Sequence, residues 1–101
     1  MKETKKETLE EQMAARGERP VLLLRRTEGG REFRYGVGVT AHPPVRYSIY
    51  AEYCATDMHT VTHIPAFSGD RDTAESFCSL LEWMQATPLS LQAIYEDSLT
   101  P

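Results

Sequence analysis

Four side chains of metal-binding type lie within ten residues of one another in the sequence: Cys54, Asp57, His59 and His63. The spacing of His59 and His63 would place both imidazoles on one face of a helix, where they can share a zinc ion. However, Pro65 and the β-branched residues between the two histidines favour an extended chain. Four residues of a strand span about 13 Å, too far for two imidazoles that each lie about 2 Å from one ion. We therefore expect no metal ion and no cofactor, with a small metal-binding or enzymatic domain built on these four residues as the alternative.

The other groups that suggest catalysis are incomplete. Glu96 and Asp97 are adjacent on a predicted helix and do not face each other, so they are not expected to share a proton. The sequence contains no G-x-S-x-G nucleophile motif, and Gly36-x-Gly38 lacks the third glycine of a dinucleotide-binding loop. Helix capping and the helix dipole account for a further acidic cluster, which comprises Asp70, Asp72 and Glu75. No catalytic constellation is recognisable.

Size, composition and charge are those of one small soluble domain. The chain has 101 residues, of which 41% are hydrophobic and 26% charged. Its net charge of −4 disfavours a nucleic-acid partner, which usually meets a basic stripe. No apolar run is long enough to span a membrane, and the N-terminus lacks the apolar segment of a signal peptide. We expect a cytoplasmic protein with reduced Cys54 and Cys78, although the sequence alone does not decide whether the two cysteines pair.

Hydrophobic periodicity predicts four strands. The run from Pro20 to Thr27 is apolar in its centre and fits a strand buried on both faces. Paired glycines after it predict a hairpin turn over residues 28–31. Strict alternation predicts strands over residues 32–40 and 46–53, and Pro65 marks a short edge strand from Thr60 to Phe67.

Two helices are predicted after the strands. Residues 70–85 place Ala74, Phe77, Cys78, Leu81 and Met84 on one helical face, and Asp72 and Glu75 have the spacing of a capping box. Thr87 and Pro88 predict the start of a second helix. Strands followed by helices indicate the α+β class. We expect a four-stranded antiparallel meander with both C-terminal helices packed on one face of the sheet.

The first nineteen residues differ from the rest of the chain. Residues 1–19 are charged and carry only a thin apolar stripe, which predicts an N-terminal arm that is either disordered or helical. Gly17 and Pro20 mark the boundary between this arm and a single α+β domain over residues 20–99.

The sheet face opposite the two C-terminal helices is the best candidate for a binding surface. Monomers seldom leave exposed a surface patch in which an aromatic side chain lies beside two depressions at glycine positions. We expect the N-terminal arm, a second copy of the chain or a partner protein to cover this face; the alternative is scattered surface residues without a binding role. The alternation assigns to this face Gly36, Gly38, Tyr50 and either Val21 with Leu23 or Leu22 with Leu24.

The C-terminal run Pro-Leu-Ser-Leu-Gln-Ala-Ile-Tyr-Glu-Asp-Ser-Leu resembles the end of the domain of unknown function 6514 family, small uncharacterised proteins of Clostridia-type Firmicutes. In that family the run looks like Pro-x-His-Leu-x-Asp-Val-x-Glu-Asp-Phe-Leu. It follows a helix and is preceded by a Tyr-Gly-Ile-type strand, here Tyr47-Ser48-Ile49 or Tyr35-Gly36-Val37. The fitting positions are Pro88, Leu91, Ile94, Glu96, Asp97 and Leu99, and the departures are Ser90, Ala93 and Ser98. The resemblance covers about residues 20–99 and implies a bacterial setting but no activity.

Together these patterns predict a protein–protein interaction or regulatory module. Its predicted contact residues are Val21, Leu23, Gly36, Gly38 and Tyr50. A homodimer or a small adaptor is expected, without nucleic acid, membrane or cofactor. A second alternative is an acidic inhibitor that occupies a basic surface on its partner, with binding that weakens as salt is added.

Overall fold

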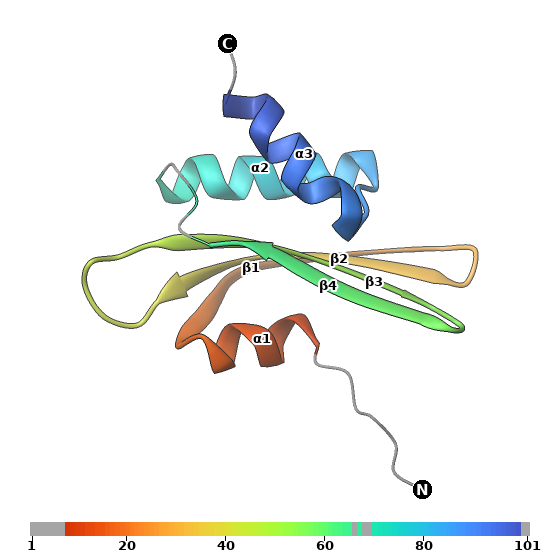
Figure 1. Ribbon diagram of the computed structural model, residues 1–101, viewed down its shortest axis with the longest axis horizontal. Coiled ribbons are helices and arrows are strands. Elements are labelled where there is room, and N and C mark those ends of the chain that lie inside the picture. Colours follow the sequence, from red (N-terminus) through yellow and green to blue (C-terminus); the bar gives the residue numbers. More distant parts are fainter. Residues whose placement is uncertain (1–7, 66, 68–69, 100–101) are drawn as a thin grey trace, which may run out of the picture.

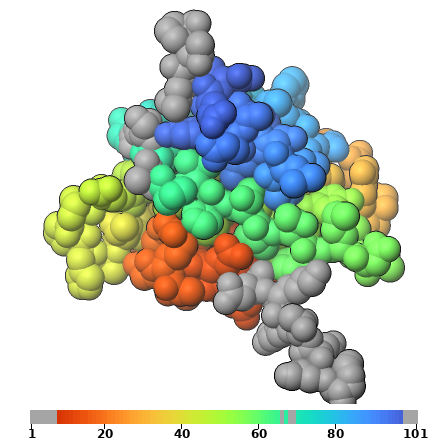
Figure 2. All heavy atoms as spheres, in the orientation of Figure 1, coloured from red at the N-terminus to blue at the C-terminus, as the bar shows by residue number. Residues whose placement is uncertain are grey.

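The computed structural model describes residues 8–65, 67 and 70–99. The elements follow in the order α1 (Leu9–Ala15), β1 (Glu18–Glu28), β2 (Arg31–Thr40), β3 (Tyr47–Ala55), β4 (Met58–Ile64), α2 (Arg71–Met84) and α3 (Pro88–Leu99). The strands form one antiparallel sheet in the order β1-β2-β3-β4, with α2 and α3 on one face and α1 on the other (Figure 1). The predicted α+β meander with two C-terminal helices on one face is confirmed. Figure 2 shows side chains filling the space between these layers.

The alternation of β2 decides which residues meet the C-terminal helices. Phe33, Tyr35 and Val37 are buried in the main core under α2 and α3. The turn that leads into β2 is formed by Gly29 and Gly30, both with positive φ, which glycine adopts without a steric penalty. β4 is an edge strand as predicted, although it begins at Met58 rather than at Thr60.

β1 departs from regular alternation near its start. It begins at Glu18, inside the stretch assigned to the arm, and its pairing with β2 shifts between Pro20 and Leu22. A bulge of this kind changes the face on which the neighbouring side chains lie. As a result, neither of the two pairs expected on the α1 face, Val21 with Leu23 or Leu22 with Leu24, lies there as a pair. Of these four residues, Leu23 alone lies on that face, opposite Gly36. The β1 side chains that pack against the main core are Val21, Leu22 and Leu24.

The two C-terminal helices are fixed at their ends. The N-cap of α2 is Asp70, whose carboxylate accepts a hydrogen bond from the Thr73 N–H over 2.9 Å. The capping box predicted from Asp72 and Glu75 is therefore wrong, because the helix has already begun at Arg71. Pro88 is the first residue of α3, as predicted. The Tyr35 hydroxyl donates to the Ala86 carbonyl over 2.6 Å and so ties the connection between α2 and α3 to the sheet. No helix in the described part of the chain has the length and apolar character to cross a membrane.

Helix α1 is held by its own cap and by a second, smaller core. Thr8 and Glu11 form a reciprocal capping box, with hydrogen bonds of 2.9 and 3.2 Å. Leu9 and Met13 are fully buried against Tyr50 on the sheet. An isolated helix of seven residues is unstable in water, so this contact with the sheet is what stabilises α1.

Candidate functional site

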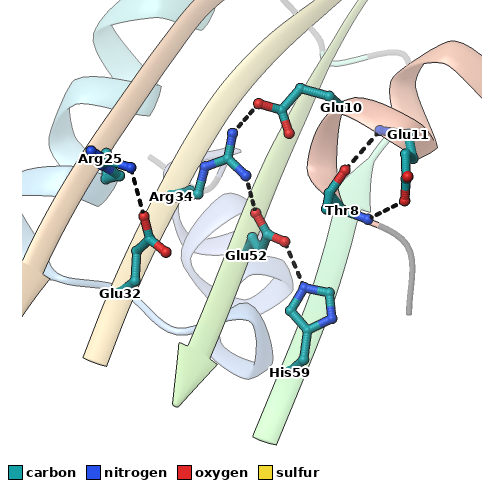
Figure 3. Close-up of polar contacts among 8 residues, drawn as sticks. All are labelled: Thr8, Glu10, Glu11, Arg25, Glu32, Arg34, Glu52 and His59. Atoms are coloured by element: carbon teal, nitrogen blue, oxygen red, sulfur yellow. Dashed lines mark hydrogen bonds and ion pairs between the residues drawn. The ribbon is translucent and has the colours of Figure 1, made fainter. Parts of the chain in front are cut away.

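A row of charged groups lies on the sheet face under α1 (Figure 3). Arg34 of β2 donates one hydrogen bond to Glu10 of α1 and another, 2.9 Å long, to Oε1 of Glu52 on β3. Glu52 is only 1% exposed, and its other oxygen, Oε2, lies 2.6 Å from Nε2 of His59 on β4. Each charge in the row therefore has a neighbour of opposite charge or a hydrogen-bonding partner, which is the condition for burying it.

The surroundings shift the pKa values of Glu10 in this row and of the nearby Cys54 thiol. Burial works to raise the pKa of the Glu10 carboxyl, but the hydrogen bond and charge of Arg34 outweigh burial and hold this pKa below its ordinary value of 4.5. Burial, together with the nearby charges of Glu52 and Glu32, raises the pKa of the Cys54 thiol. The thiol is therefore protonated at neutral pH unless a cation approaches it.

Cys54 extends the row into a group of three different donor atoms. Its sulfur, a carboxylate oxygen of Glu52 and an imidazole nitrogen of His59 lie within 4.8 Å of one another. Cys54 and His59 are cross-strand partners on β3 and β4, and Glu52 lies two residues before Cys54 on the same face. Among the described residues, this group has the donor types and the spacing of a metal site.

Of the four residues singled out in the sequence for a metal, the structure brings two together, Cys54 and His59. Asp57 is exposed in the turn between β3 and β4. His63 lies further along β4, where its ring stacks on Tyr50 with centroids 5.4 Å apart. Neither Asp57 nor His63 belongs to the donor group. Both cysteines of the chain, including the buried Cys78 of α2, are free thiols.

Sequence reasoning did not find Glu52 as a member of this group. The signal was present, because Glu52 and Cys54 share a face of β3 and the short turn after β3 places His59 opposite Cys54. The helical spacing of His59 and His63 pairs the two histidines with each other, whereas the hairpin pairs His59 with Cys54. In a hairpin, donor atoms converge across strands rather than along them.

A second buried carboxylate, Glu18, lies at the other end of the α1 face. Ser48 donates to its Oε2 over 2.8 Å, and the Tyr50 hydroxyl donates to its Oε1 over 2.6 Å. Arg16 lies 3.4 Å from the same carboxylate and donates to the Tyr50 hydroxyl over 3.0 Å. Burial, followed by the Glu18 carboxylate, raises the pKa of Tyr50. The cluster is saturated with internal hydrogen bonds, so it holds β1, β3 and the end of α1 together.

The predicted contact residues lie in different environments. Val21 packs against the main core, and Leu23 is half-exposed on the α1 face. Gly36, Gly38 and Tyr50 are buried. Side chains of α1 lie over Gly36 and Tyr50, while Gly38 faces the Glu18 cluster. A helix of the same chain, from the N-terminal arm, thus fills the face that the sequence indicates as a binding surface.

Exposed apolar side chains gather instead on the outer side of the C-terminal helices. Leu80, Trp83 and Met84, here called the α2 stripe, have the i, i+3, i+4 spacing of one helical side and are all exposed. α3 begins at Pro88, four residues after Met84, beside a cavity of about 210 Å³. The cavity is lined by Tyr53, Met58, Thr60, Thr87, Pro88 and Leu89.

Comparison of the chain with protein-family models, with curated protein sequences and with solved structures gives no significant match. The resemblance to the domain of unknown function 6514 family stays a prediction.

Proposed function

We propose that this protein is a cytoplasmic protein-interaction module that binds a partner through the α2 stripe and the adjoining cavity at the start of α3. The observation that carries the proposal is the exposure of Trp83, the only tryptophan of the chain, at 74%. Tryptophan is strongly enriched among the residues that dominate binding energy in protein interfaces. Burying a large apolar side chain contributes about 1.5–3 kcal/mol, so leaving this one in water makes a contact with another protein favourable.

The neighbours of Trp83 extend the apolar surface. Leu80 and Met84 flank it on α2, and Leu89, which is 90% exposed, stands at the edge of the cavity on α3. Met58 from the β3–β4 hairpin lines the same cavity. Because α1 already fills the other face of the sheet, a partner reaches this surface without displacing part of the chain. A ridge beside a pocket suits a partner that inserts one apolar anchor.

The charge of the chain favours a partner of a particular kind. Residues 71–101 contain five acidic residues and one basic residue, whereas residues 1–70 contain ten of each, so the net charge of −4 lies entirely in the C-terminal part. Two copies of the chain that met through this layer would bring like charges together. A different protein, with basic residues around an apolar contact, is complementary to it. The acidic inhibitor considered from the sequence is one form of this binding mode.

Photo-crosslinking tests the proposal. A photoreactive amino acid is placed at position 83 and, as a control, at Ala14 on the exposed side of α1. In extracts of the native cells, we expect position 83 alone to label a protein, and the label to weaken as salt is added. Unlabelled wild-type protein should compete for the label, and Trp83→Ser should not. That variant keeps its fold because Trp83 lies largely in solvent.

Two results would contradict the proposal. One is labelling of the same proteins from positions 14 and 83, which would indicate non-specific contact. The other is crosslinking only between copies of this chain, which would show that the surface serves self-association.

A further inference from the structure

We propose that Glu52, Cys54 and His59 form a binding site for a zinc ion or a related divalent transition metal ion. The site lies on the α1 side of the sheet, opposite the surface proposed for protein binding, so the two proposals stand or fall independently. It differs from the site considered from the sequence, because Glu52 is a member and Asp57 and His63 are not.

The donor types select the metal. Zinc binds thiolate sulfur at about 2.3 Å and imidazole nitrogen or carboxylate oxygen at about 2.0–2.2 Å, usually in a tetrahedron. Calcium and magnesium instead take ligand sets made of oxygen atoms. One sulfur, one nitrogen and one oxygen from three side chains therefore fit zinc, or a metal with similar preferences such as cobalt.

The distances are close to those that such an ion needs. In a tetrahedron with these bond lengths the ligand atoms lie about 3.3–3.8 Å apart. The three donor atoms already lie within 4.8 Å of one another, and the pair Glu52 Oε2 and His59 Nε2 is 2.6 Å apart. Side-chain movements of about 1 Å are enough to place all three around one ion, without any change in the backbone.

The backbone that presents these donors is rigid. Glu52 and Cys54 are on β3, paired with β2 on one side and with β4 on the other. His59 is the second residue after the two-residue turn and pairs with Cys54. Sites built on paired strands hold their ligands more accurately than sites built on loops.

A second layer of contacts orients the carboxylate. Arg34 binds Oε1 of Glu52 and so directs the other oxygen, Oε2, toward His59, as Figure 3 shows. Arg34 is in turn held by Glu10 of α1. Contacts of this type fix the orientation of metal ligands and tune their affinity. The N-terminal helix thereby takes part in positioning the site.

The charges balance when the ion is bound. Zinc binding displaces the thiol proton of Cys54 to solvent, and the thiolate with the Glu52 carboxylate neutralises the two positive charges of the metal. Arg34 keeps Glu10 as its own counter-charge. Three protein ligands leave the fourth tetrahedral position for a water molecule, and His59 and Cys54 are both partly exposed, so solvent has access to it.

Cobalt(II) titration of the full-length reduced protein tests the site. We expect one equivalent of cobalt to bind and to produce the thiolate-to-metal charge-transfer band and visible bands of a tetrahedral complex. Cys54→Ser should remove the charge-transfer band. Substitution of a residue that only orients a metal ligand weakens metal binding by about 10–100-fold. His59→Gln removes a ligand itself and should therefore weaken cobalt binding by more than that. Zinc should displace the cobalt and abolish the spectrum.

Matched controls come from Asp57 and His63, the two metal-ligand candidates from the sequence that do not belong to the donor group. His63→Gln changes a histidine on the same face of the same strand, and Asp57→Asn changes an acidic residue in the adjoining turn. Both variants should bind cobalt like the wild type. Absence of a charge-transfer band in the wild type would overturn the proposal. So would a band that survives Cys54→Ser, or equal losses in His59→Gln and His63→Gln.

Discussion

Arg34 and Glu52 lie directly opposite each other on β2 and β3, with 2.9 Å between Arg34 Nη1 and Glu52 Oε1. The carboxylate is almost fully buried, whereas the guanidinium reaches from the sheet to Glu10 on α1. This pair joins the sheet to the N-terminal helix. It also fixes the orientation of the carboxylate beside Cys54 and His59.

Removing the guanidinium leaves a buried carboxylate without its cationic partner. We expect Arg34→Met to lower the free energy of unfolding by about 3 kcal/mol, because breaking a buried pair costs far more than breaking an exposed one. Arg25→Met is the matched control: its pair with Glu32 also joins two neighbouring strands, β1 and β2, but the Arg25 side chain is 69% exposed. The control should change stability by less than about 1 kcal/mol. Urea unfolding followed by tryptophan fluorescence and by circular dichroism measures both, and similar losses in the two variants would contradict the account.

Gly38 is required by the buried Glu18 carboxylate. A Cβ at position 38 would lie 2.7 Å from Glu18 Oε1, and that oxygen cannot move away without losing its hydrogen bond to Tyr50. We expect Gly38→Ala to destabilise the protein by about 1–3 kcal/mol. At Gly36 the nearest atom is the terminal methyl of Met13, 2.9 Å away, at the end of a flexible side chain. Gly36→Ala should therefore cost less, and thermal unfolding of the two variants would reveal the reverse order if the argument is wrong.

The contact between Glu10 and Arg34 makes the docking of α1 sensitive to acid. In the folded protein the pKa of Glu10 lies below its ordinary value of 4.5, so the folded state favours the ionised carboxyl. This contribution is complete above about pH 4.5 and is lost as the pH falls through the lowered pKa. The stability difference between wild type and Glu10→Gln should therefore be largest near neutral pH and shrink in acid.

Urea unfolding at a series of pH values measures that difference. The Arg34→Met background provides the control, because Glu10→Gln should have little effect once the guanidinium is absent. A difference that stays constant across the pH range, or that grows in acid, would show that the ion pair does not stabilise the folded state.

Several features of the fold follow from local sequence alone. The alternation of residues 33–39 selects the face of β2 that enters the main core, because successive side chains of a strand point to opposite sides. The helical period around Phe77 and Leu81 selects the buried side of α2, and Pro88 marks the start of α3. These signals depend on neighbours along the chain, and they sufficed to predict the order and class of the elements.

Tertiary structure decided how the faces are used. The bulge after Pro20 moves Val21 into the main core, and α1 rather than another molecule covers Tyr50. Cross-strand pairing brings Cys54 to His59 and adds Glu52, which lies two residues before Cys54 on the same face of β3. The reason is physical: periodicity fixes the face of each side chain, but the register between strands and the docking of a short helix depend on contacts between residues that are distant in sequence.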